Sequence, residues 1–183
     1  MNKDDIRRHV KARKTLLTEH DKTQAAARVF GLLEQTAEFI LAGNILMYHS
    51  LPDELSTREF IAKWSGRKRF FLPRVNGVNL EILPYDSQRL ALGSFHIEEP
   101  TGDDLTSIDE IELIITPGVA YDRRGARLGR GRGYYDRLLA STRAVKIGVG
   151  YDFQLVDKVP VEPHDVMMDA IITESGYIVV RRK

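Results

Sequence analysis

The spacing of apolar residues at the start of the chain predicts two consecutive helices. Residues 2–17 place apolar side chains at helical intervals among charged ones. Residues 18–39 repeat this pattern with an apolar face along one side. Thr18 is followed three residues later by Asp21, which resembles a capping box and indicates where the second helix begins.

Short apolar runs without helical spacing predict the strands of a sheet. The first run, 44–49, is continuous, which is typical of a parallel strand buried on both faces. Residues 69–73 and 78–83 flank a short turn at Asn76 and Gly77 and indicate a hairpin. The later runs expected to form strands are 111–115, 146–150, 170–173 and 177–180.

Helices are expected between these strands, and their alternation predicts the fold class. Residues 56–59 resemble a second capping box and open a short helix that ends near Trp64. A turn or short helix is expected over 152–156 and a loop over 160–165. We therefore expect a single α/β domain over 1–183 with an open, largely parallel sheet flanked by helices.

Composition narrows the class of protein further. The chain has 183 residues, of which 43% are hydrophobic and 29% charged, and its formal net charge is +1, as in ordinary soluble globular proteins. It has no cysteine, which excludes disulfides and thiolate chemistry. The first residues are charged, and no apolar run is long enough to span a bilayer. We expect a cytoplasmic protein that is not attached to a membrane.

The most unusual stretch of the sequence covers residues 117–139. Within 122–137 it has six arginines against two aspartates, a local balance of 6 − 2 = +4 in a nearly neutral chain. An apolar run leads into the stretch and a helical pattern leads out of it, so the unit is strand, loop, helix. The glycines that interrupt the arginines are Gly125, Gly129, Gly131 and Gly133.

The chemistry of this loop favours binding of an anion. Glycines allow positive φ and a close approach of ligand to backbone, and arginine grips phosphate oxygens in pairs. The spacing matches neither the Walker loop nor the dinucleotide fingerprint, so it indicates phosphate without saying which compound carries it. A basic flexible loop or an RNA-binding segment would have a similar composition. The tyrosine pair 134–135 and the helical exit argue against the first, and the near-neutral chain argues against the second.

The whole stretch resembles a known family signature far more specifically than its glycines do. The string R-L-G-R-G-R-G-Y-Y-D, preceded by P-G-V-A-Y-D, is similar to that of the 5-formyltetrahydrofolate cyclo-ligase family. The resemblance implies a three-layer fold and an enzyme of one-carbon metabolism that cyclises 5-formyltetrahydrofolate to 5,10-methenyltetrahydrofolate. In this family ATP and Mg²⁺ are required, ADP and phosphate are released, and the formyl oxygen is phosphorylated to an iminium phosphate. It also implies a small-molecule substrate, with or without a polyglutamate tail, a monomer, and no nucleic-acid partner.

The resemblance assigns roles to residues of the loop and of the first helix. Arg127, Arg132 and Tyr134 match catalytic positions. Lys3 and Arg7 match two positions that contact ATP, whereas their spacing alone would fit a solvated basic helix face. The other positions implied to contact the nucleotide are Leu128, Gly129, Arg130, Gly131, Gly133 and Tyr135, together with Arg127, Arg132 and Tyr134.

The same resemblance implies folate and metal positions. Glu54 matches a glutamate that holds the pterin ring, and His49 falls at a variable position lining the substrate. Arg130, Gly131, Arg132, Gly133 and Tyr134 match further folate positions. Asp136 and Asp165 match the aspartates at Mg²⁺. One departure is His96, which stands where the family often has glycine. A different ATP-dependent enzyme on the same fold is the alternative.

Overall fold

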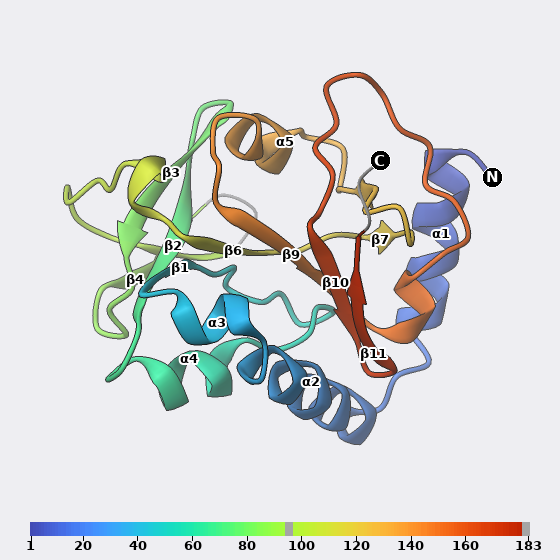
Figure 1. Ribbon diagram of the computed structural model, residues 1–183, viewed down its shortest axis with the longest axis horizontal. Coiled ribbons are helices and arrows are strands. Elements are labelled where there is room, and N and C mark those ends of the chain that lie inside the picture. The colour runs from blue at the N-terminus through green and yellow to red at the C-terminus, as the bar shows by residue number, and fades with distance from the viewer. Residues whose placement is uncertain (94–96, 181–183) are drawn as a thin grey trace.

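The computed structural model describes residues 1–93 and 97–180, and in this part of the chain seven strands form one sheet (Figure 1). The strand order is β11-β10-β9-β6-β1-β2-β3, in which the five inner strands run parallel and the two outer strands run antiparallel to their neighbours. The strands are β1 (Asn44–Leu46), β2 (Arg69–Asn76), β3 (Asn79–Pro84), β6 (Leu113–Thr116), β9 (Val145–Val149), β10 (Ala170–Thr173) and β11 (Gly176–Val179). The predicted α/β fold with an open, largely parallel sheet flanked by helices is confirmed.

Alternating residues of β1, β2, β6 and β10 feed two cores on opposite faces of the sheet. Ile45 belongs to the core under α2 (Glu19–Glu34), α3 (Ala37–Leu41) and α4 (Arg58–Trp64). The next residue, Leu46, belongs to the core under α5 (Tyr134–Leu139), on the other face. Figure 1 shows the same layers, with α2, α3 and α4 below the sheet and α5 above it. Strands buried on both faces read as continuous apolar runs, which is why they could be found in the sequence.

The first helix packs at one end of the sheet, against a ribbon that the sequence did not predict. Helix α1 (Lys3–Lys14) buries Ile6 and Val10 against β7 (Ala120–Tyr121) and β8 (Arg127–Leu128), which pair antiparallel (Figure 1). The Asn2 side chain caps the helix. This contact fixes one face of α1 beside the glycine-rich stretch that follows β8.

The prediction of one helix over 18–39 is wrong, because the helix is interrupted at Thr36. The Thr36 hydroxyl donates to the Leu33 carbonyl at 2.8 Å and accepts from the Phe39 N–H at 3.2 Å. It therefore caps α3 as a separate helix, since a side chain that bonds the local backbone competes with helix continuation. The capping box predicted at Thr18 is confirmed, with Asp21 as its third residue.

The capping box predicted over 56–59 is wrong for a related reason. Thr57 is fully buried, and its hydroxyl donates to the Tyr48 carbonyl at 2.8 Å instead of capping α4. Its own N–H donates to the Ser50 hydroxyl at 3.2 Å. These bonds hold the 47–57 connection against the end of β1. Strand β1 itself ends at Leu46, whereas the sequence predicted a strand over 44–49.

The remaining elements lie in the connections. The sequence did not predict the pair β4 (Leu90–Leu92) and β5 (Glu98–Pro100), nor the 3₁₀ turn η2 (Ile108–Glu110). The turn η3 (Asp152–Gln154) agrees with the turn or short helix expected over 152–156. No helix in the described residues is long and apolar enough to cross a bilayer.

Candidate functional site

The topology of the sheet creates a crevice between β1 and β6. From β1 the chain passes through α4 to β2 on one side, whereas β6, β9 and β10 follow one another on the other side. The connections after β1 and β6 therefore leave in opposite directions, and ligands of open α/β sheets bind at such a point. A cavity of about 10 Å³ lies there. Its lining residues are Lys14, Tyr48, Glu54, Leu55, Pro117, Gly118, Val149 and Gln154.

Arg127 is a buried cation beside this crevice. Its side chain is only 4% exposed, and its Nη1 donates to the Pro117 carbonyl at 3.0 Å. Its Nη2 lies 3.7 Å from Asp136 Oδ1, while Nε has no hydrogen-bond partner. A Cβ on Gly129 would come within 3.1 Å of Arg127 Nη1, so a glycine lets the loop lie against the guanidinium. A buried cation with an unmade hydrogen bond is costly to the fold, which indicates a role in binding.

Helix α1 carries two further cations, Arg7 at the glycine-rich loop and Lys3 at the 162–165 segment. Arg7 Nε donates to the Gly129 carbonyl at 3.1 Å. One turn earlier, Lys3 Nζ lies 3.2 Å from Glu162 Oε1 and 3.8 Å from Asp165 Oδ2. Arg7 is therefore packed against the loop, whereas Lys3 pairs with acids of the 162–165 segment.

The glycine-rich loop has a backbone that only glycine adopts easily. Gly131 and Gly133 have φ of 107° and 72°, in the left-handed region, and Gly133 immediately precedes α5. The exit of the loop is tied to the turn between β2 and β3. Tyr134 donates from its hydroxyl to the Gly77 carbonyl at 3.4 Å, and Arg137 donates to the Val78 carbonyl. The loop thus lies between α1 and this turn.

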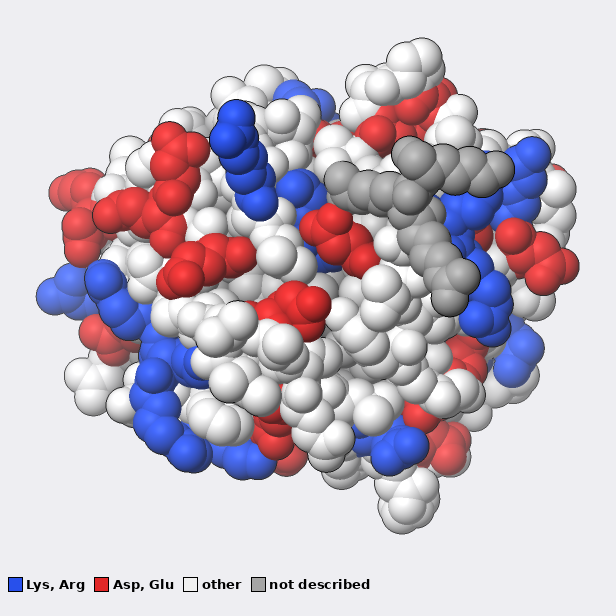
Figure 2. Space-filling view, viewed as in Figure 1, with Lys and Arg blue, Asp and Glu red and all other residues white. Residues whose placement is uncertain are grey.

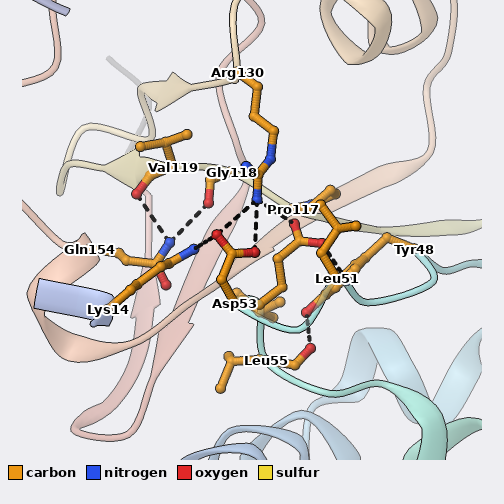
Figure 3. Close-up of polar contacts among 12 residues, drawn as sticks. Lys14, Tyr48, Leu51, Asp53, Leu55, Pro117, Gly118, Val119, Arg130 and Gln154 are labelled. Carbon is orange, nitrogen blue, oxygen red and sulfur yellow. Dashed lines mark hydrogen bonds and ion pairs between the residues drawn. The ribbon is translucent and has the colours of Figure 1, made fainter. Parts of the chain in front are cut away.

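Glu54 is a nearly buried carboxylate at the crevice. Its side chain is 13% exposed, and its Oε1 accepts from the Leu51 N–H at 2.9 Å. Burial raises the pKa of Glu54, although the Leu51 N–H, Arg130 and Lys14 act in the opposite direction. Figure 3 shows Arg130 reaching across from the glycine-rich loop to the 51–55 segment. Its Nη2 lies 3.8 Å from Glu54 Oε2, so the structure brings the two predicted residues together.

His49 lies among a different set of charges. Its Nε2 is 3.8 Å from Glu98 Oε2, and Glu98 also pairs with Arg58 at 3.2 Å. Burial, followed by the Arg58 charge, lowers the pKa of His49, which favours the neutral ring. His96, the departure from the family pattern, lies outside the described residues.

The two aspartates expected at a metal each lie beside a cation. Asp136 is near Arg127, as described above, and Asp165 is 9% exposed and accepts from the Glu162 N–H at 2.8 Å. No cluster of three or more His, Asp or Glu side chains that could hold a metal is found in residues 1–93 and 97–180. Mg²⁺ bound to a nucleotide uses only one or two carboxylates together with phosphate oxygens, so the absence of a larger cluster does not conflict with such an ion.

Sequence reasoning missed a larger cavity next to Glu54. It has a volume of about 560 Å³, within the usual range of ligand pockets, and lies between α2, α4 and the 50–56 segment. Phe30 and Phe60 contribute aromatic rings, and Glu54 lines both this cavity and the crevice. These residues carry no distinctive sequence signal, because aromatic positions at helical spacing are also typical of core.

Two charged residues at the crevice were also missed. Asp53 pairs with Arg130 at 3.2 Å and with Lys14 at 3.6 Å (Figure 3). Lys14 could have been found, because it follows Arg7 by seven residues and so lies on the same helix face. On the face drawn in Figure 2, cationic and anionic side chains are interspersed, so this face offers no broad basic surface for nucleic acid.

Comparisons with known proteins identify the family to which the chain belongs. Residues 1–174 match the family model described as the 5-formyltetrahydrofolate cyclo-ligase family. The chain is 31% identical over 176 residues to 5-formyltetrahydrofolate cyclo-ligase of Escherichia coli strain K12, covering 91% of this chain and 97% of that protein. It is 30% identical over 176 residues to that of Haemophilus influenzae, covering 90% and 92%.

Two solved structures have the same fold. The NMR structure of Aquifex aeolicus 5,10-methenyltetrahydrofolate synthetase superposes with a TM-score of 0.90 at 29% identity, covering 100% of this chain and 95% of that one. The 5,10-methenyltetrahydrofolate synthetase of Mycoplasma pneumoniae superposes with a TM-score of 0.76 at 22% identity, covering 95% and 99%. At that lower identity the second comparison supports the fold alone.

Proposed function

This chain belongs to the 5-formyltetrahydrofolate cyclo-ligase family, and we propose that it couples ATP cleavage to closure of 5-formyltetrahydrofolate into 5,10-methenyltetrahydrofolate. As a ligase of this family it acts on a folate. In the proposed reaction the folate formyl oxygen takes the γ-phosphoryl group of ATP and ADP leaves. Nitrogen 10 of the folate then adds to the activated carbon, and phosphate leaves as the ring closes.

The observation that carries the nucleotide half of the proposal is the hydrogen bond from Arg7 Nε to the Gly129 carbonyl. This bond joins Arg7 of α1 to a loop that begins at the buried Arg127, so cations from two distant segments support a phosphate site here. Phosphoryl transfer requires mainly positioning and charge stabilisation, and these groups supply both. We propose that Lys3, Arg7 and Arg127 bind phosphate oxygens.

The loop itself completes the proposed nucleotide site. Its glycines let phosphate approach the backbone between Leu128 and Tyr135, and Arg130 and Arg132 extend from it. Arg132 is proposed to act with Arg127 on the phosphoryl group that is transferred. Because the substrate supplies its own nucleophile, no Ser, Cys or Lys nucleophile is required of the protein.

The folate half of the proposal rests on Glu54. Its buried carboxylate lies 3.8 Å from Arg130 of the loop and lines a cavity large enough for a fused ring. A carboxylate accepts hydrogen bonds from adjacent N–H groups, which the pyrimidinone ring of a folate presents. We propose that Glu54 orients the pterin while Tyr134 contacts the folate beside the transferred phosphoryl group. His49, which pairs with Glu98, is proposed to line the outer part of this site.

Asp136 and Asp165 are proposed to hold Mg²⁺ with the nucleotide. When bound, Mg²⁺ would neutralise the charge on the phosphate oxygens. Arg127 lies beside Asp136, and Lys3 lies beside Asp165.

Phosphate release measured with and without the folate tests the proposal. We expect the protein with Mg²⁺ and ATP to release phosphate only when 5-formyltetrahydrofolate is added, and to release one phosphate for each folate closed. Phosphate release that is independent of the folate would instead indicate an ATPase or a ligase of another substrate and would contradict the proposal.

A further inference from the structure

We propose that Asp53 holds Arg130 away from the nucleotide, and that Lys14 takes the place of Arg130 at Asp53 when the loop takes up ATP. The inference rests on the proposed function, because it concerns the same nucleotide loop. It assigns roles to two residues outside the predicted site, one on the 51–55 segment and one at the end of α1.

Asp53 holds Arg130 in the structure. Arg130 Nη2 lies 3.2 Å from Asp53 Oδ1 and 3.4 Å from Oδ2, and 3.8 Å from Glu54 Oε2 (Figure 3). In this position the guanidinium is turned toward two carboxylates. It cannot bind a phosphate with the same donors until it leaves Asp53. Asp53 therefore opposes the use of Arg130 by a nucleotide.

Lys14 approaches the same carboxylate from the other side. It is the last residue of α1, and its Nζ lies 3.6 Å from Asp53 Oδ2. Its side chain is 8% exposed, and the charges near it are Asp53, Glu54 and Arg130. Burial lowers the pKa of Lys14, and the two carboxylates act in the opposite direction. A nearly buried amine depends on these acids to remain charged.

The two cations differ in their freedom to leave Asp53. The Arg130 side chain is 51% exposed and is carried by the glycine-rich loop, so it can turn toward a phosphate at small cost. Lys14 is enclosed at the end of a helix that is fixed to the ribbon β7–β8. When Arg130 turns away, Lys14 remains as the counter-ion of Asp53. Asp53 and Glu54 then still have a cation beside them, which lowers the free-energy cost of releasing Arg130.

The competition makes a specific prediction about pairs of substitutions. Asp53→Asn removes the hold on Arg130, so the Kd and KM for ATP should fall about two- to fivefold, the range expected for an exposed ion pair. Lys14→Met leaves Arg130 as the remaining partner of Asp53, so both constants should rise by a similar factor. In the double variant Asp53→Asn/Lys14→Met, residue 53 has no charge for which Arg130 and Lys14 could compete. Adding Lys14→Met to Asp53→Asn should therefore not raise the Kd or the KM for ATP. The kcat should change little, because the chemical step follows release of Arg130.

The experiment measures the Kd for ATP by titration calorimetry, and KM and kcat by methenyl formation, for the full chain. Lys11→Met is the matched control, because Lys11 is an exposed lysine on the same helix. Arg130→Met is a second test background, in which Asp53→Asn should have no effect on the Kd. Thermal denaturation of each variant checks that it is folded.

Non-additivity of the two substitutions decides the question. If Lys14→Met raises the Kd by the same factor in the wild-type chain and in the Asp53→Asn variant, the effect is a general loss of positive charge and the inference is overturned. It is also overturned if neither substitution changes the Kd. Either result would leave the proposed function intact as long as the wild-type chain turns over the folate. A wild-type chain that binds no ATP would contradict both this inference and the proposed function.

Discussion

Arg127→Met should separate folding from turnover. The Arg127 side chain is 4% exposed and leaves Nε without a partner, which costs about 1–3 kcal/mol for a buried donor. Methionine removes that cost but also removes the bond to the Pro117 carbonyl, worth about 1.5–3 kcal/mol for a charged donor. Its other partners are Asp136, which is 21% exposed and can be hydrated, and the ring of Tyr135, whose centroid lies 5.6 Å from the guanidinium carbon. The opposing terms are similar, so the free energy of unfolding should change by less than about 2 kcal/mol.

Turnover should respond very differently. If the guanidinium is an already positioned donor to the transferred phosphoryl group, its loss should lower kcat about 10²- to 10³-fold. Methenyl formation at saturating ATP and folate measures this loss, and thermal denaturation of the same sample measures stability. A folded Arg127→Met protein that keeps most of its turnover would refute the reasoning.

Arg124→Met is the matched control, three residues away. Arg124 Nη2 lies 2.8 Å from Oδ2 of Asp122, whose side chain is fully buried, and donates to the Val159 carbonyl at 3.1 Å. Removing this arginine should lower the melting temperature and leave turnover per folded molecule unchanged. The two substitutions should therefore have opposite effects on stability and activity.

Three further predictions follow from single contacts. Burial raises the folded-state pKa of Glu54 above 4.5, so the stability that this shift gives is full below pH 4.5 and is lost as the pH rises through the folded pKa. The melting temperature of Glu54→Gln, relative to that of the wild type, should therefore be higher at pH 7 than at pH 4.5, and its KM for the folate should rise. The same difference in melting temperature at both pH values would contradict the assignment. Asp136→Asn should raise the Mg²⁺ concentration that gives half-maximal turnover, and an unchanged Mg²⁺ titration would remove Asp136 from the metal site. Gly125→Ala should destabilise by about 1–3 kcal/mol in urea denaturation, because Gly125 has a φ of 93° and a Cβ there would lie 2.7 Å from the Met168 carbonyl; an unchanged midpoint would refute this.

The sheet could be predicted from the sequence because its strands are buried on both faces. Apolar runs such as 111–115 are expected inside a sheet that is covered on both faces. The parallel direction of the strands follows from the helices that connect them. The errors lie where a side chain bonds the backbone in a way that depends on the rest of the fold. Thr36 interrupts a helix that the apolar pattern would continue. The Thr57 hydroxyl donates to the Tyr48 carbonyl and therefore does not cap a helix.

The candidate site was predictable only in part. The composition of the glycine-rich loop indicates phosphate, but its contact with Arg7 joins residues 122 positions apart and depends on how α1 packs. Asp53 gives no signal of its own, because a loop acid is ordinarily solvated, and its importance comes from the meeting of Arg130 and Lys14. The cavity beside Glu54 likewise exists only once α2 and α4 are in place.

The most direct test of the account is the absorbance of the methenyl product when the protein is mixed with Mg²⁺, ATP and 5-formyltetrahydrofolate. The account predicts that the absorbance grows with time, and that it stops growing when ATP is left out or Mg²⁺ is chelated. A folded protein that produces no methenyl product in the complete mixture, or produces it equally well without ATP, would contradict the account.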